Sequence, residues 1–104
     1  MDVDLIRDVI EQYSTHGWKL RRVLAVDPGE LNGMEFPEDV AVSNAGFNAL
    51  WFSRRSRPGS ETWELRRADG SPFALLTTVP NGSDVSETLA ILAETEQKML
   101  ARRN

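Results

Sequence analysis

The chain has 104 residues, of which 40% are hydrophobic and 27% charged, a composition that excludes a wholly disordered polypeptide and suits a single domain over residues 1–104. The formal net charge is −4, which argues against a dedicated duplex-DNA binder, since such domains are usually basic. The absence of cysteine excludes disulfides, thiolate nucleophiles and cysteine-ligated metal centres.

The first predicted element is an amphipathic helix over residues 3–15. Its apolar positions recur at helical spacing: Leu5, Ile6, Val9, Ile10 and Tyr13. Either Asp2 or Asp4 can cap the first turn, and both carboxylates suit the positive end of the helix dipole. The acidic start lacks the basic and apolar regions of a signal peptide, and no apolar run is long enough for a membrane helix. We therefore expect a cytoplasmic protein that does not bind a membrane.

Gly17 is predicted to end this helix in a left-handed conformation. A Schellman ending would then place Trp18 against Tyr13 in the last helical turn. His16 is the only histidine in the chain. We expect it to cap the helix end, where a positive charge meets the carbonyl groups, because nothing in the sequence fixes a catalytic partner for it.

Residues 18–26 are predicted to form the first strand. One face of this strand is expected to carry Trp18, Leu20, Leu24 and Val26, and the other Lys19 and Arg21. A proline followed by glycine in residues 27–30 predicts a type II turn. Residues 31–46 lack clear periodicity and predict a long connection, within which only residues 40–43 suggest a short strand.

Three further strands are predicted over residues 47–55, 61–67 and 73–79. The first is apolar on both faces, which is typical of a central strand. In the hairpin that joins the other two, a two-residue turn would separate their hydrophobic side chains onto different faces. A three-residue loop with a glycine bulge pairs Arg67 with Ser71 and keeps these side chains together, so we expect the bulged loop.

The last predicted element is a helix that reaches about residue 101. Asp84 and Glu87 form a variant of the capping box at its start. Its buried stripe is expected to contain Val85, Leu89, Leu92, Met99 and Leu100. The fold class is therefore α+β: an antiparallel sheet of about four strands flanked by N- and C-terminal helices, in the order helix, strand, long loop, three strands, helix.

A search for reactive groups finds no catalytic constellation. The acidic residues Glu30, Glu35, Glu38 and Asp39 lack the regular spacing and glycine turn of a calcium site, so we expect a solvated loop. The glycines lie in separate turns and form no phosphate-binding loop between a strand and a helix. The sequence therefore predicts no enzyme, no metal site and no cofactor.

One part of the sequence combines arginines with aromatic residues, as many binding surfaces do. The candidate binding residues are Trp51, Phe52, Arg54, Arg55, Arg57, Arg66 and Arg67. Three interpretations remain open. The aromatic residues can fill the core while arginines solvate the strands, the set can form a protein interface, or it can grip an anion or single-stranded nucleic acid.

Trp51 and Phe52 point to opposite faces of the sheet, because neighbouring residues on a strand alternate. The two terminal helices can cover one face, and the aromatic side chain on the other face then needs its own cover. Either residues 31–46 or a second copy of the chain can supply it. We expect a homodimer, since two-fold dimers are the commonest oligomers.

The leading hypothesis for function is a non-catalytic protein-interaction domain that binds itself or a protein partner through the sheet face. An alternative is binding of an anion or single-stranded nucleic acid through the arginine and aromatic residues, although the acidic total disfavours nucleic acid. A second alternative is a small-ligand site beneath residues 31–46, which requires an enclosed pocket containing polar groups there.

Overall fold

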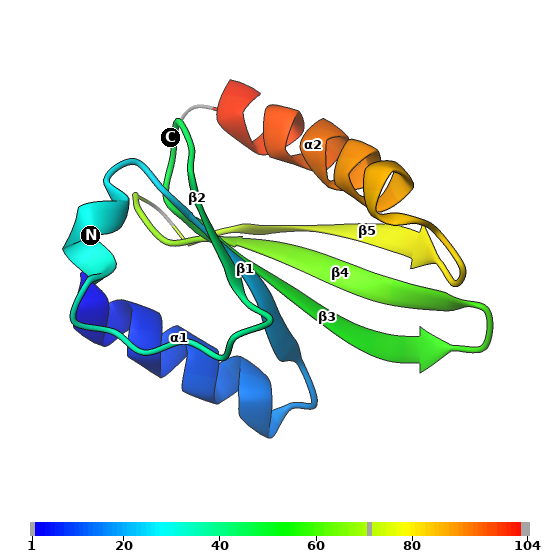
Figure 1. The fold of residues 1–104 in the computed structure, drawn as a ribbon, viewed down its shortest axis with the longest axis horizontal. Helices are drawn as coiled ribbons and strands as arrows, with labels where there is room; N and C mark the ends of the chain where they lie inside the picture. Colours follow the sequence, from blue (N-terminus) through cyan, green and yellow to red (C-terminus); the bar gives the residue numbers. More distant parts are fainter. Residues whose placement is uncertain (1, 71, 103–104) are drawn as a thin grey trace.

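The computed structural model describes residues 2–70 and 72–102, without the side chains of residues 56 and 57. The described chain runs through α1 (Val3–Thr15), β1 (Lys19–Ala25), η1 (Pro28–Leu31), β2 (Ala41–Asn44), β3 (Ala49–Arg57), β4 (Ser60–Arg67), β5 (Ala74–Pro80) and α2 (Val85–Ala101), where η1 is a short 3₁₀ helix. The predicted α+β class and the helix at each end are confirmed (Figure 1). In the described ranges, no helix is both long and apolar enough to cross a membrane.

The strands form one mixed sheet in the order β2-β1-β3-β4-β5. The expectation of about four antiparallel strands is corrected to five, because β2 pairs parallel to β1 at the sheet edge. A parallel neighbour needs a crossover of a dozen or more residues, and the segment between β1 and β2, which contains η1, supplies it. The type II turn predicted at residues 27–30 is wrong, because Gly29 lacks the positive φ that such a turn requires. These residues instead begin η1, where the Asp27 side chain accepts a hydrogen bond from the Gly29 amide.

The two helices lie on opposite faces of the sheet (Figure 1). On the α1 face, Ile6 and Val9 pack with Leu50 and Phe52. On the α2 face, one cluster contains Leu24, Phe47, Ala49, Trp51, Trp63, Leu65, Val79, Leu92 and Met99. Our expectation that both helices share one face is therefore wrong. Apolar residues on both sides of a strand indicate that both faces are buried, but they do not show which helix covers which face.

A β-bulge in β1 changes which residues share a face. The pairing with β3 shifts register between Leu20 and Arg22, so that Arg21 is an extra residue on β1. The predicted common face of Trp18, Leu20, Leu24 and Val26 is consequently wrong, because Leu20 belongs to the cluster beneath α1 and Leu24 to the cluster beneath α2. Bulges commonly re-aim side chains in this way.

The β4–β5 hairpin has the predicted faces but a longer loop. Leu65 pairs with Leu75, and the Arg67 amide donates to the Phe73 carbonyl at 2.9 Å. The expected pairing of Arg67 with Ser71 is wrong, because Arg67 is bonded to Phe73 instead. Ser71 itself lies outside the described residues. Because the loop lengthens by two residues rather than one, the hydrophobic side chains of both strands still share the α2 face.

Local signals at the helix ends act as predicted. The Asp2 side chain accepts from the Leu5 amide, and Gly17 has a φ of 83°. The Trp18 amide donates to the Tyr13 carbonyl at 3.0 Å, which is the long bond of a Schellman motif, and the two rings meet edge to face at 6.0 Å.

The buried side of α2 differs in part from the predicted stripe. Asp84 caps the helix through the Glu87 amide, as expected. Leu92 and Met99 are buried together with Thr95, whereas Val85, Leu89 and Leu100 are exposed. Helical spacing alone marks a wide apolar arc, and the sheet covers only part of it.

Candidate ligand-binding cleft

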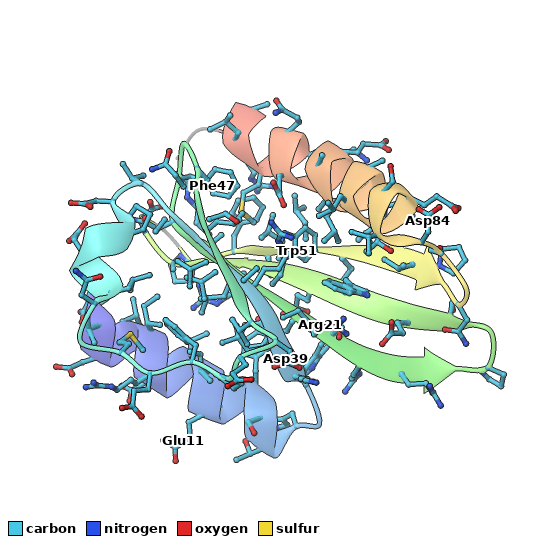
Figure 2. The ribbon with its side chains drawn as sticks, in the orientation of Figure 1. Glu11, Arg21, Asp39, Phe47, Trp51 and Asp84 are labelled. Atoms are coloured by element: carbon cyan, nitrogen blue, oxygen red, sulfur yellow. The ribbon has the colours of Figure 1, made fainter. Side chains whose placement is uncertain are left out.

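The two aromatic residues predicted to bind a partner lie inside the domain. The side chains of Trp51 and Phe52 are both 0% exposed. Trp51 points towards α2 (Figure 2), and its indole donates to the Glu96 carboxylate at 2.8 Å. Phe52 stacks on Tyr13 of α1 with ring centroids 4.0 Å apart. Neither side chain is presented to a partner in this structure.

The five predicted binding arginines do not form one surface. Arg54 and Arg66 pair with residues at opposite ends of the β3–β4 ladder. Arg54 lies over the Trp18 ring at 4.6 Å, and Arg67 pairs with Asp69 at 2.7 Å. Arg55 is exposed, and the side chain of Arg57 lies outside the described part of the structure. Tertiary structure thus separates residues that the sequence placed close together.

A different pair of arginines lines a cleft of about 390 Å³ between the sheet and the first turns of α2. We call this the α2 cleft. It is formed by β1, β4, the end of β5 with the turn after it, and the start of α2. These contribute, among others, Arg21, Arg22, Trp63, Val79, Ser83, Val85, Leu89 and Leu92. The bulge in β1 brings consecutive arginines to this one cleft, which a regular strand would separate to opposite faces.

Arg21 is held in place by three neighbours. Its guanidinium donates to the Ser53 hydroxyl at 3.1 Å and lies 3.8 Å from the Glu61 carboxylate. It also lies over the Trp63 ring, 4.6 Å from the centroid. A cation above an indole face is favourable, so Arg21 and Trp63 stabilise each other's positions.

Arg22 is less completely paired. One terminal nitrogen donates to the Ser43 hydroxyl at 3.2 Å. Its Nε is buried and has no acceptor among the described residues. The ion pairs found within the described ranges do not include Arg22. Its positive charge is therefore not neutralised by direct contact with a carboxylate of this part of the chain.

Trp63 has a second buried donor without an acceptor. Its side chain is 3% exposed, and no group of the described residues accepts from its Nε1. Trp51, whose ring meets that of Trp63 at 6.0 Å, does have an acceptor in Glu96. A buried unsatisfied donor costs about 1–3 kcal/mol, and such groups are rare in folded proteins. The two side chains that carry such donors, Arg22 and Trp63, line the same cleft.

Acidic residues limit the positive charge of the α2 cleft. Asp39 lines it near Arg21 (Figure 2), and Lys19 binds the Asp39 carboxylate at 2.8 Å. The hydrogen bond and charge of Lys19 lower the pKa of Asp39, so this carboxylate is ionised at neutral pH. Glu61 also lines the cleft and lies against Arg21. The cleft therefore contains two cations and two anions, with Arg22 the cation lacking a carboxylate partner in the described ranges.

Comparison with known proteins adds no guide to this site. No protein-family model, curated protein or solved structure matches the chain. The function is therefore inferred from the chemistry of the cleft itself. The sequence signal for the α2 cleft was weak, because consecutive arginines on a strand are expected to diverge and only the bulge aligns them.

A second hollow, of about 620 Å³, lies between α1 and the connection from η1 to β2. Ile10, Trp18, Leu20, Met34 and Phe36 provide its apolar lining. Residues 34–37 of the predicted 31–46 loop line this hollow, but it is open, whereas the predicted small-ligand site needs an enclosed pocket. Apolar side chains dominate its lining, and none of its polar side chains is a buried donor without an acceptor in the described ranges. The chemistry for recognising a ligand is therefore weaker here than in the α2 cleft.

Proposed function

We propose that this chain is a non-catalytic binding domain that takes a small anionic ligand in the α2 cleft. The observation that carries the proposal is a pair of buried N–H donors, Arg22 Nε and Trp63 Nε1, that lack acceptors among the described residues and belong to two side chains lining the same cleft. A carboxylate or phosphate oxygen is the acceptor that a guanidinium and an indole N–H together recognise, because hydrogen bonds to a charged acceptor are the strong ones.

The charges of the cleft favour a ligand with one negative charge. Arg22 can neutralise one anion, whereas Asp39 and Glu61 repel additional negative charge brought to the same space. Polyphosphates and nucleic-acid backbones are therefore poorly matched. The proposed site uses Arg21 and Arg22 in place of the arginines predicted from the sequence, and anion binding remains the proposed activity.

The proposal is tested by following the indole N–H resonances of the three tryptophans in a ¹H–¹⁵N NMR titration with acetate and with methyl phosphate. We expect saturable movement of the Trp63 signal, because its N–H gains an acceptor, and little movement of the Trp51 signal, because Glu96 already accepts from it. A ligand in the hollow beside α1 would instead move the Trp18 signal.

The matched variants are Arg22→Gln and Arg54→Gln. Loss of a hydrogen bond to a charged group corresponds to about a 10- to 100-fold weaker affinity, so Arg22→Gln should weaken anion binding by that factor. Arg54→Gln should leave it unchanged, because Arg54 lies over Trp18 and does not line the α2 cleft. A Trp63 signal that is unmoved by either anion, or moved equally by chloride, contradicts the proposal.

Self-association, the leading hypothesis from the sequence, is retained as a second proposal with different support. Trp51 and Phe52 no longer motivate it, because both are buried within the chain. The outer edge of β5 now supports self-association, because the pairing with β4 directs the backbone groups of Ala74, Leu76 and Thr78 away from the sheet. Leu76 is 63% exposed, and the strand carries no charge that would guard its edge.

Sedimentation equilibrium at micromolar concentration tests this second proposal. A dimer that dissociates in a Leu76→Lys variant supports pairing through β5, since a charged residue on an edge strand opposes such pairing. A single species of 11.7 kDa contradicts it.

A further inference from the structure

The mouth of the α2 cleft carries apolar side chains that the core does not need. Val85 is 76% exposed and Leu89 is 41% exposed, and both line the cleft. Leu92, which also lines it, is 1% exposed and belongs to the core. Scattered exposed apolar residues are ordinary, but these two border the cleft that is also lined by Arg22 and Trp63, the side chains with unpaired donors in the described ranges.

These three residues form a row along α2. Their spacings of four and three places put them on one side of the helix. The row therefore runs from the buried floor of the cleft, at Leu92, to its mouth, at Val85. Arg22 and Trp63 lie on the sheet side of the same space. The cleft thus has a polar side on the strands, which includes Arg22, and an apolar wall on the helix.

We propose that the ligand is an amphipathic monoanion, an inference that rests on the proposed anion-binding function. Its single oxyanion head group accepts from Arg22 and Trp63, and its short apolar chain or ring lies along Leu89 and Val85. The cleft volume of about 390 Å³ lies near the lower end of the range for small-molecule sites, so the apolar part is short. Carboxylate and sulfate heads present the same charge and acceptor chemistry, and the test separates them.

The test is a chain-length series measured on the full chain through the Trp63 indole signal. The probes are acetate, butanoate, hexanoate and octanoate, with hexyl sulfate and hexan-1-ol for comparison. Each methylene that leaves water for the apolar wall should tighten binding about fourfold, until the chain extends beyond the cleft. Hexan-1-ol should bind more weakly than hexanoate by at least tenfold, because it lacks the charge that Arg22 recognises.

Leu89→Ser and Leu5→Ser are a matched pair of variants, because the two leucines lie on helices and are each 41% exposed. Leu89→Ser should flatten the dependence of affinity on chain length. Leu5→Ser should leave that dependence unchanged, because Leu5 is on α1 and does not line the cleft. Val85→Ser, at a more exposed position, provides a second test of the wall should Leu89→Ser fold poorly.

The outcomes separate the two proposals. Acetate binding that does not strengthen with chain length overturns the amphipathic ligand and leaves the anion site standing. An absence of binding by every anion overturns both. A preference for hexyl sulfate or hexanoate identifies the head group, and equal binding of hexan-1-ol and hexanoate overturns the role of Arg22.

Discussion

Trp51 and Trp63 lie side by side in the core, but their indole N–H groups have different surroundings. Trp51 donates to Glu96, and Trp63 has no acceptor among the described residues. This contrast separates an indole N–H that is hydrogen-bonded within the fold from one that, in our proposal, donates to a ligand. Both residues supply similar apolar area to the core, so the comparison isolates the N–H.

We expect Trp51→Phe to destabilise the protein more than Trp63→Phe, by about 1–2 kcal/mol. The first substitution removes a hydrogen bond to a carboxylate, whereas the second removes a donor that is unsatisfied without ligand. Chemical denaturation of both variants measures the difference. Equal losses of stability would show that Trp63 does have an acceptor in the folded protein.

Tyr13, the only tyrosine, provides a prediction about pH. Its hydroxyl donates to the Glu64 carboxylate. Burial, followed by this hydrogen bond and the charge of Glu64, raises the pKa of Tyr13 above the usual value of 10.0. Above that pH the unfolded chain loses the phenolic proton while the folded chain keeps it. The contribution of Tyr13 to stability is therefore complete below pH 10 and falls as the pH rises further.

Ultraviolet absorbance of the phenolate measures this titration directly, because no second tyrosine contributes. Glu64→Gln should lower the pKa only in part, since burial is the largest cause and remains. In Tyr13→Phe the loss of stability above pH 10 should be smaller than in the parent protein. Titration of Tyr13 at its ordinary pKa in the folded chain would contradict this reading.

At the scale of elements, the signals that end α1 are local and were predictable. Gly17 adopts a positive φ because the Schellman motif requires it, and the motif places Trp18 on Tyr13. No atom lies within 4 Å of where a Cβ on Gly17 would stand. The requirement for glycine is therefore conformational and not steric.

We accordingly expect Gly17→Ala to cost about 1–2 kcal/mol, the penalty for a left-handed residue with a Cβ. Gly33→Ala is the control, because Gly33 also has open space around it but is not among the glycines with positive φ. That substitution should be neutral or slightly stabilising. Thermal unfolding of both variants measures the difference, and equal effects would argue against a conformational requirement at position 17.

The bulge in β1 is an element that the sequence did not predict. In the sequence, the side chains of residues 20–22 fit the regular alternation of a strand, and no local signal identifies Arg21 as an extra residue. With the bulge, β1 pairs with β3 on one side and β2 on the other while Val23 and Leu24 are buried and Leu20 is half-buried. The consequence of the bulge is that Arg21 and Arg22 line one cleft.

At the scale of the whole molecule, the sheet is covered on both faces by its own helices (Figure 1). The doubly apolar β3 is explained by this three-layer arrangement, with Trp51 beneath α2 and Phe52 beneath α1. The predicted need for a second copy to cover an aromatic face consequently loses its basis. Two spaces lie beside these layers: the α2 cleft, between the first turns of α2 and the bulged β1, and the hollow beside α1.

The sequence by itself determined what depends on neighbours in the chain: both helices with their caps, the strands β1, β3, β4 and β5, and the face shared by Trp63 and Leu65. Tertiary structure decided what depends on distant partners. It paired β2 with β1, sent the helices to opposite faces, buried Trp51 and Phe52, and dispersed the predicted arginines. Capping and alternation act over a few residues, whereas a cleft is formed where elements far apart in sequence pack against one another.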